Sequence, residues 1–281
     1  MIPIGTAVQQ ARFRLENEDV ESPRLDAELL LAHVLETNRA SVLAHPERLL
    51  TQKELTRFRA LVARRAAREP LPYIVGTREF YGLAFAVDDR VLIPRPETEL
   101  LVERAVRFAR HLAAPRIADV GAGSGAIAVT LAVQLPMATV YALDASAGAL
   151  EVAGDNARRH RVDNRVHRLQ GDLLDPLPEP VHLIVANLPY VTTAEWQELA
   201  PEIRNHEPRT ALDGGEDGLD LVRRLLASAG PWLEPGGAIV LEIGAAQGDA
   251  ATTAAREHFP EARVCVAHDY AGRDRMIVLE R

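Results

Sequence analysis

From Arg116 to the C-terminus, short apolar runs alternate with helical stretches, and this alternation constrains the fold more than any other feature of the sequence. Strands that alternate with helices build a mostly parallel sheet with helices on both faces. Ligands bind such sheets at the carboxyl ends of the strands, near the switch in strand order. We therefore expect a seven-stranded, mostly parallel α/β sheet with the strands RIADV (116–120), TVYALD (139–144), VHRLQG (166–171), HLIVAN (182–187), GAIVLEI (237–243), ARVCVA (262–267) and RMIVLE (275–280). The intervening helices are expected over 125–134, 146–160, 217–229 and 247–258.

The first 69 residues lack this alternation and predict a small helical bundle. Thr51 and Glu54 have the spacing of a capping box, and the apolar residues after them repeat at helical spacing. The run RFRALVARRAARE (57–69) carries five arginines. We interpret this run as a solvated helix face, with partner binding as the less favoured alternative.

Residues 70–97 differ from the segments on either side. Prolines and the alternating run LAFAV are typical of a hairpin-like linker. We therefore expect three parts: a helical domain over 1–69, a linker over 70–97 and a ligand-binding domain over 98–281.

Charge is unevenly distributed along the chain, which has a net charge of −8. Residues 1–86 hold 12 basic and 11 acidic side chains, whereas residues 87–281 hold 20 basic and 29 acidic ones. The net negative charge of residues 87–281 would repel a phosphate backbone. Direct binding of nucleic acid is therefore not expected. The sequence has neither an apolar run of membrane-spanning length nor an apolar leader, and its nine histidines lack ligand spacing. We expect a cytoplasmic, monomeric protein without a membrane span or a metal site.

A glycine-rich turn follows the first predicted strand of the sheet. In DVGAGSG, Gly121, Gly123 and Gly125 let the backbone approach a ligand closely where a Cβ would clash. Such a turn alone serves dinucleotides, other nucleotides or ordinary tight turns. Asp119 narrows the choice, because a carboxylate just before the turn repels a pyrophosphate and suits a cationic or amine-bearing ligand.

The next two predicted strands also end in acidic residues. Asp144 can accept hydrogen bonds from both hydroxyl groups of a ribose. Asp172 and Leu173 follow the third strand, where they can bond the edge of an adenine ring and cover it. Taken together, these strand ends describe a pocket for a nucleoside with a positively charged amino-acid tail. S-adenosylmethionine fits this description and NAD does not; for each position taken singly, an ordinary turn residue is the alternative.

The tetrapeptide Asn187-Leu188-Pro189-Tyr190 ends the fourth predicted strand, which lies beside the first in a sheet of this kind. An amide or aromatic amine nitrogen is a poor nucleophile, so hydrogen-bond acceptors must hold its N–H groups and leave the lone pair facing the methyl group. Asn187 offers a side-chain oxygen and Leu188 a backbone carbonyl. Pro189 biases Leu188 toward an extended backbone, and Tyr190 offers a flat face for stacking. The tetrapeptide predicts a methyl-accepting site that works by positioning and electrostatics, with a simple strand end as the alternative.

With DVGAGSG, ALD, GDLL and NLPY in this order, the sequence resembles class I methyltransferases, which have a Rossmann-like sheet. Three further strings are similar to the HemK/PrmC family, the protein-(glutamine) methyltransferases that modify peptide-chain release factors. The helical first domain is also similar to that of the family, so the resemblance spans nearly the whole chain. The three strings are PLPYIVGTREFYGLAF (70–85), LIPRPETE (92–99) and EPRTALDGGEDGL (207–219).

The resemblance implies methylation of the glutamine side-chain amide in the Gly-Gly-Gln motif of bacterial release factors, with S-adenosylmethionine as donor and S-adenosylhomocysteine as product. The helical domain would hold the release factor, and residues 187–190 would hold the glutamine. The cofactor-binding residues implied by motif position are Asp119, Gly121, Ala122, Gly123, Ser124, Gly125, Asp144, Asp172, Leu173 and Asn187. The residues implied to wall the pocket are Pro94, Arg95, Pro96, Glu97 and Thr98.

Leu188 departs from the family, whose tetrapeptide has a proline at this position. A backbone carbonyl does not depend on the side chain, so the acceptor is retained while the fixed φ angle is lost. Adenine methyltransferases acting on ribosomal RNA also carry N-L-P-Y, so methylation of an adenine amino group of RNA or DNA stays an alternative. Methylation of a glutamine of a ribosomal protein is another. A non-catalytic S-adenosylmethionine-binding regulator is a third, but it predicts a damaged tetrapeptide, which this sequence does not have.

Overall fold

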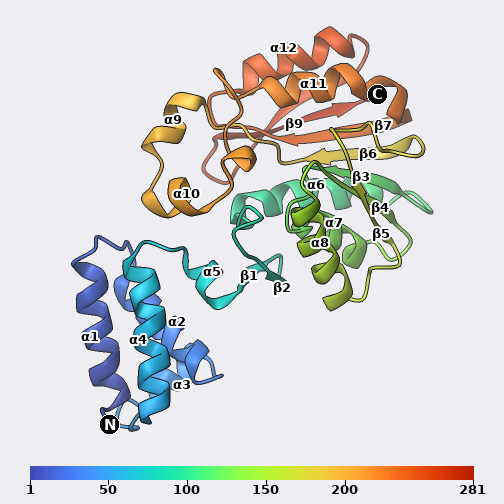
Figure 1. Ribbon diagram of the computed structural model, residues 1–281. Helices are drawn as coiled ribbons and strands as arrows, with labels where there is room; N and C mark the ends of the chain where they lie inside the picture. The colour runs from blue at the N-terminus through green and yellow to red at the C-terminus, as the bar shows by residue number, and fades with distance from the viewer. The chain divides into compact units, whose positions relative to one another are not determined.

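A computed structural model describes residues 1–281 and divides the chain into two compact units (Figure 1). The helical unit comprises Met1–Thr77 and Ala200–His206, and the sheet unit comprises Arg78–Leu199 and Glu207–Arg281. The segment expected to be a linker is thus divided between the two units. Residues 200–206 join the helical unit, although the sequence predicted them to belong to the ligand-binding domain.

The helical unit is built from amphipathic helices around one apolar core. The predicted capping box is confirmed: the Thr51 hydroxyl accepts from the Glu54 N–H, and the Glu54 carboxylate accepts from the Thr51 N–H. Leu30, Leu31 and Phe58 are among the fully buried core side chains. The helices are α1 (Ile4–Glu16), α2 (Pro23–Val34), α3 (Arg39–Ala44), α4 (Gln52–Ala66), α5 (Leu71–Val75) and α10 (Pro201–His206).

The interpretation of the arginine run as a solvated helix face is wrong for Arg65. Its side chain is buried, and its Nε donates to Asp26 Oδ2 at 2.7 Å. The same guanidinium donates to Glu202 of α10 at 3.1 Å, and Arg68 donates to the other oxygen of Glu202 at 2.7 Å. A buried guanidinium requires such charged partners, so these arginines hold α4 to α2 and to α10.

The predicted seven-stranded sheet is confirmed, with the order β5-β4-β3-β6-β7-β9-β8. Every neighbouring pair from β5 to β7 is parallel, and β9 runs antiparallel to both β7 and β8. The strands are β3 (Arg116–Val120), β4 (Thr139–Asp144), β5 (Val166–Gln170), β6 (Val181–Ala186), β7 (Leu233–Glu242), β8 (Arg263–His268) and β9 (Asp274–Glu280).

Helices cover both faces of this sheet, so its strands are apolar on both sides (Figure 1). Alternate residues of β6 enter different cores: Leu183 and Val185 pack with α6 and α7, whereas Ile184 and Ala186 pack with α11 and α12. The helices of this unit are α6 (Glu99–Ala109), α7 (Ala126–Gln134), α8 (Ala147–Arg159), α9 (Thr193–Glu198), α11 (Asp220–Ala229) and α12 (Gly248–His258), with 3₁₀ turns η1 (Pro96–Thr98), η2 (Arg209–Ala211) and η3 (Gly230–Trp232).

A two-stranded hairpin, β1 (Thr77–Phe80) and β2 (Leu83–Ala86), precedes the large sheet. Tyr81 and Gly82 form its turn with positive φ angles of 53° and 71°, as a tight two-residue hairpin turn requires. Phe80 and Phe85 anchor the hairpin in the core on the α6–α7 side of the sheet. No helix of the chain is long and apolar enough to cross a membrane.

Candidate active site at the carboxyl ends of the strands

The switch in strand order lies between β3 and β6, whose chain connections lead to opposite sides of the sheet. The two strands are paired in parallel, with Val120 opposite Ala186. The glycine turn that follows Val120 therefore lies next to the tetrapeptide that follows Ala186. The ends of β4 and β5 lie at the same edge of the sheet, as the sequence predicted.

The glycine turn adopts a left-handed backbone conformation that favours glycine. Gly121, Gly123 and Gly125 have φ angles of 78°, 53° and 76°. Gly125 also serves as the N-cap residue of α7, where a Cβ would lie 3.0 Å from the Ala153 side chain. Between these glycines, Ala122 and Ser124 are buried.

Asp119 is completely buried and carries one unsatisfied oxygen. Its Oδ2 accepts from the Ala128 N–H in the first turn of α7 at 2.9 Å, whereas Oδ1 has no hydrogen-bond partner. Burial and, to a smaller extent, the Asp144 charge raise its pKa to about 7, against a lowering by the hydrogen bond from Ala128. Capping of α7 is a role that the sequence analysis missed, and Oδ1 remains available to a buried donor.

Asp144 holds the glycine turn from the end of β4. One carboxylate oxygen accepts from the Gly123 N–H at 2.9 Å, and the other accepts from the Ser146 N–H at 2.8 Å. An ionised carboxylate has about four acceptor sites, so both oxygens keep capacity for a ligand.

Asp172 and Leu173 lie after the end of β5. The Asp172 carboxylate is largely exposed and pairs with Arg224 of α11. Leu173 has a positive φ of 47° and packs at the edge of the core on the α11–α12 side. The ion pair with Arg224 was not foreseen, and contact with an adenine ring stays a prediction.

The Asn187 amide is fixed by the segment that was expected to wall the pocket. Its Nδ2 donates to Thr98 Oγ1 at 3.0 Å, and the Thr98 side chain is buried. Leu188 is buried in the core on the α11–α12 side. The Tyr190 hydroxyl donates to Glu242 Oε1 at 3.2 Å.

Glu242 is a buried acid at the end of β7 that the sequence analysis missed. It is 2% exposed, and burial raises its pKa to about 7. Thr98, Tyr190 and Arg275 lower the pKa, and the Glu97 charge raises it. Burial and the Glu242 charge also raise the pKa of the Tyr190 hydroxyl, which stays protonated. The signal in the sequence is an acidic residue that closes the otherwise apolar run AIVLE.

Two family descriptions match the chain: the PrmC N-terminal domain over residues 6–76 and the Methyltransferase small domain over residues 96–216. A release factor glutamine methyltransferase of Geobacter sulfurreducens is 46% identical over 247 residues, covering 88% of this chain and 86% of the relative. Another, of Moorella thermoacetica, is 45% identical over 276 residues, covering 98% and 97%. The chain belongs to the release factor glutamine methyltransferase family.

The resemblance drawn from the sequence is thereby confirmed. The structure of a methyltransferase from Pyrococcus furiosus superimposes with a TM-score of 0.52 at 16% identity, covering 72% of this chain and 90% of that one. At this identity the likeness shows the fold alone.

In this member of the release factor glutamine methyltransferase family, two of the family strings converge on the Asn187–Tyr190 loop. Glu207 is buried, accepts from the Ile93 N–H at 3.0 Å and pairs with Arg95. The string 207–219 is thus tied to the string 92–99, which carries Thr98. Of the remaining residues of the expected wall, Pro94 is buried, whereas Pro96 and Glu97 are exposed.

Glycines and one glutamine hold the far end of the same loop. The Val191 N–H donates to the Leu212 carbonyl at 3.0 Å, and the Val191 carbonyl accepts from the Gly214 N–H at 2.8 Å. Gln247 Nε2 donates to the Tyr190 carbonyl at 2.9 Å and to the Asp217 carbonyl at 3.0 Å. Side chains at positions 214 and 218 would collide with the carbonyls of residues 189 and 190, so the string needs its glycines there.

Proposed function

We propose that this chain transfers a methyl group from S-adenosylmethionine to the side-chain amide nitrogen of the glutamine in the Gly-Gly-Gln motif of bacterial release factors. Membership of the family supports this substrate. The observation that carries the proposal is the Asn187 amide, anchored through its nitrogen to Thr98 beside the glycine turn. This anchoring leaves Oδ1 as the end of the amide that can accept from a substrate N–H.

The residues at the strand ends fit the donor. The glycine turn leaves room for a ligand against the backbone, and Asp119 Oδ1 is a buried oxygen without a donor, which suits an ammonium group. Asp144 would accept from the ribose hydroxyls, and Asp172 with Leu173 would bind the adenine. When bound, S-adenosylmethionine supplies an electrophilic methyl group and leaves as S-adenosylhomocysteine.

The tetrapeptide would hold the glutamine amide. Asn187 Oδ1 and the Leu188 carbonyl would accept from its two N–H groups, so that the nitrogen lone pair faces the methyl carbon. The Tyr190 ring, fixed through its hydroxyl by Glu242, would stack on the planar amide. As the N–CH₃ bond forms and the S–CH₃ bond breaks, the nitrogen loses one proton, which passes to solvent. These groups would hold and orient the amide rather than act as a strong base, so the catalysis is mainly positional and electrostatic.

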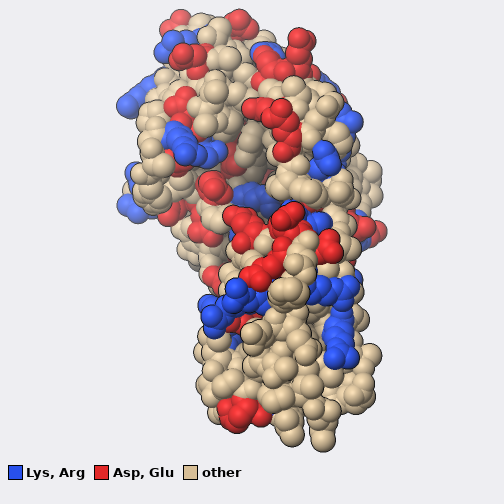
Figure 2. Space-filling view, turned by 90° about the vertical axis from the view of Figure 1, so that its left-hand side faces the viewer, with Lys and Arg blue, Asp and Glu red and all other residues tan.

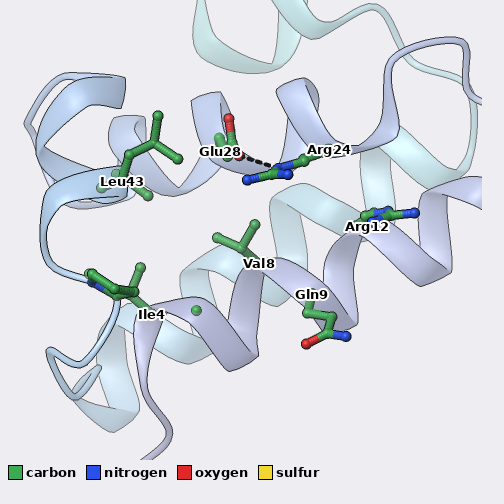
Figure 3. A pocket seen from close by; sticks show the side chains of 10 residues that line it. Ile4, Val8, Gln9, Arg12, Arg24, Glu28 and Leu43 are labelled. Carbon is green, nitrogen blue, oxygen red and sulfur yellow. Dashed lines mark hydrogen bonds and ion pairs between the residues drawn. The ribbon is translucent and has the colours of Figure 1, made fainter.

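The helical unit offers a surface for the rest of the release factor. A cavity of about 310 Å³ opens between α1, α2 and α3 (Figure 3). Its wall combines the apolar Ile4, Val8 and Leu43 with Arg24, which is paired with Glu28. A mixed surface of this kind suits a protein partner. The proposed substrate supports a reaction in the cytoplasm, catalysed by a monomer.

Methylation of an adenine amino group is the second candidate, because Leu188 gives the tetrapeptide that adenine methyltransferases carry. Figure 2 shows one face of the molecule, on which acidic and basic side chains are interspersed without a continuous basic stripe. Nucleic-acid binding depends on such a stripe to neutralise phosphates. The charges on this face, together with the excess of acidic over basic side chains in residues 87–281, therefore favour the release factor.

Mass spectrometry tests the proposal. The protein is incubated with S-adenosylmethionine and either a bacterial release factor, the same factor with its motif glutamine changed to alanine, ribosomal RNA, or ribosomal proteins. We expect a mass increase of one methyl group on the motif glutamine of the unchanged factor only. Methylation of the RNA or of a ribosomal protein, with an unmodified release factor, would overturn the proposal in favour of that substrate.

A further inference from the structure

The Asn187 amide can accept from a substrate N–H only if its oxygen, and not its nitrogen, faces the substrate. Its nitrogen donates to Thr98 Oγ1 at 3.0 Å. A hydroxyl both donates and accepts, so Thr98 alone binds either end of the amide equally well. A further group must decide in which direction the hydrogen bond runs.

The Glu242 carboxyl faces the same hydroxyl. The Thr98 side chain is near enough to lower the pKa of this carboxyl, and Glu242 Oε2 has no hydrogen-bond partner. The exposed fractions of Thr98 and Glu242 are 4% and 2%, so bulk water does not satisfy either group. The Thr98 hydroxyl therefore has one hydrogen left to donate. Glu242 Oε2 is the buried acceptor that lacks a donor, so the two groups suit each other.

We propose that Glu242 is a positioning residue that acts through Thr98 to keep the Asn187 oxygen turned toward the substrate. An ionised carboxylate accepts hydrogen bonds and donates none. It therefore obliges Thr98 to donate to Glu242 and to accept from Asn187, which fixes the amide in the productive direction. The proposal rests on the proposed function, since it concerns the amide that would hold the glutamine.

The relay depends on the ionisation of Glu242. The groups that face this carboxyl are the hydroxyls of Thr98 and Tyr190 and the charges of Arg275 and Glu97. Burial outweighs the favourable partners and raises the pKa to about 7. Below that pH the neutral Glu242 carboxyl can donate a hydrogen bond to Thr98. The direction of the hydrogen bond between Thr98 and Asn187 is then no longer fixed. Turnover at saturating substrates should therefore fall on the acidic side of pH 7.

The test measures kcat and KM of the full chain on a release factor, across pH, in the wild type and three variants. Thr98→Val removes the hydroxyl and should lower kcat about 10- to 100-fold, as a misplaced catalytic group does, with KM for S-adenosylmethionine nearly unchanged. Thr98→Ser keeps the hydroxyl and should retain most of the activity. In Glu242→Gln the new amide can both donate to and accept from Thr98, so kcat should fall. Because this amide does not ionise, the variant should also lose the acidic limb of the pH profile.

Thr130→Val is the matched control. Thr130 is a buried threonine of α7 whose hydroxyl donates to the Ala126 carbonyl at 2.6 Å, away from the relay. The Thr130→Val variant should lose some thermal stability and keep its kcat. It thereby separates the effect of losing a buried hydroxyl from the effect of losing the orientation of the Asn187 amide. Equal kcat in Thr98→Val and Thr98→Ser, or an acidic limb unchanged in Glu242→Gln, would overturn the relay.

The orientation of Asn187 can also be observed without turnover. The side-chain NH₂ signals of Asn187 in a ¹⁵N spectrum report the hydrogen bond to Thr98. We expect slow hydrogen exchange in the wild type and in Thr98→Ser, and fast exchange in Thr98→Val and Glu242→Gln. Inactivity of the wild type on release factors would reject the proposed function, whereas identical exchange in all four proteins would reject the relay.

Discussion

The Leu188 side chain packs beneath the glycine turn: its Cδ2 lies 3.2 Å from the place that a Cβ on Gly121 would occupy. Leu188 is 4% exposed and belongs to the apolar core on the α11–α12 side. The side chain that departs from the family's proline thus supports the glycine turn. This packing ties the backbone of the tetrapeptide to that of the glycine turn across the β3–β6 pair.

Gly121→Ala should weaken binding of S-adenosylmethionine at least tenfold. The new Cβ needs a backbone with a φ of 78° and must displace Leu188, so the turn shifts. Calorimetry measures the affinity. Gly236→Ala is the matched control, because Gly236 has a φ of 75° with no atom within 4 Å of its Cβ position, and it should cost stability without loss of affinity.

Leu188→Pro should change kcat by less than about threefold, because the acceptor is the backbone carbonyl and proline only pre-sets φ. The lost contact beneath Gly121 should instead appear as a lower melting temperature, as expected for removal of a buried leucine. Steady-state kinetics and thermal unfolding on the same sample separate the two effects. A large gain in kcat would show that the leucine carbonyl is misplaced in the wild type.

Asn187→Ala should lower kcat about 100-fold or more and leave the affinity for S-adenosylmethionine within a few fold, since the amide acts mainly on the acceptor nitrogen. Single-turnover methylation of a release factor measures the first quantity, and calorimetry the second. Asn187→Asp keeps an oxygen and can test the role of the anchored nitrogen. Full turnover in the alanine variant would remove Asn187 from the mechanism.

The layout of this site follows from the sequence, because the carboxyl ends of parallel strands meet at one edge. The glycine turn, Asp144 and the tetrapeptide could therefore be brought together from strand order alone. The residues that support the site, such as Glu242 and Glu207, could not be predicted in this way. Glu242 lies 52 residues from Tyr190, and Glu207 lies 112 residues from Arg95, so no local periodicity links them. Arg65 was misjudged for the same reason, since Glu202, which it meets in the helical unit, is 137 residues away.

Asp144→Ala should weaken cofactor binding about tenfold or more by loss of two charge-assisted acceptors for the ribose. The same change frees the N–H groups of Gly123 and Ser146 that the carboxylate holds, which loosens the turn. Calorimetry with S-adenosylmethionine measures the loss. Asp155→Ala on α8, whose exposed carboxylate pairs with Arg158, should bind the cofactor as the wild type does. Unchanged affinity in Asp144→Ala would exclude Asp144 from the ribose site.

Asp119→Asn should make the cofactor-free protein more stable at pH 8. The pKa of Asp119 is about 7 in the folded protein and close to the ordinary aspartate value of 3.8 in the unfolded chain, so the fold favours the protonated form. Its contribution to stability is present in full below the unfolded pKa and is lost as pH rises through 7. Asparagine keeps an oxygen for the Ala128 N–H and never ionises, so it avoids that loss.

The free energy of unfolding of the wild type should therefore fall between pH 5 and pH 8 by about 2–3 kcal/mol more than that of Asp119→Asn. Urea unfolding of both proteins across this range measures the difference, and the contribution of Glu242 cancels because both proteins retain it. The same variant should bind S-adenosylmethionine more weakly, since it lacks a charge to meet the ammonium group. Parallel pH profiles of stability would mean that Asp119 is already ionised at pH 5. In that case the unsatisfied Oδ1 must be held by a partner in the cofactor-free protein, and its assignment to the ligand would fail.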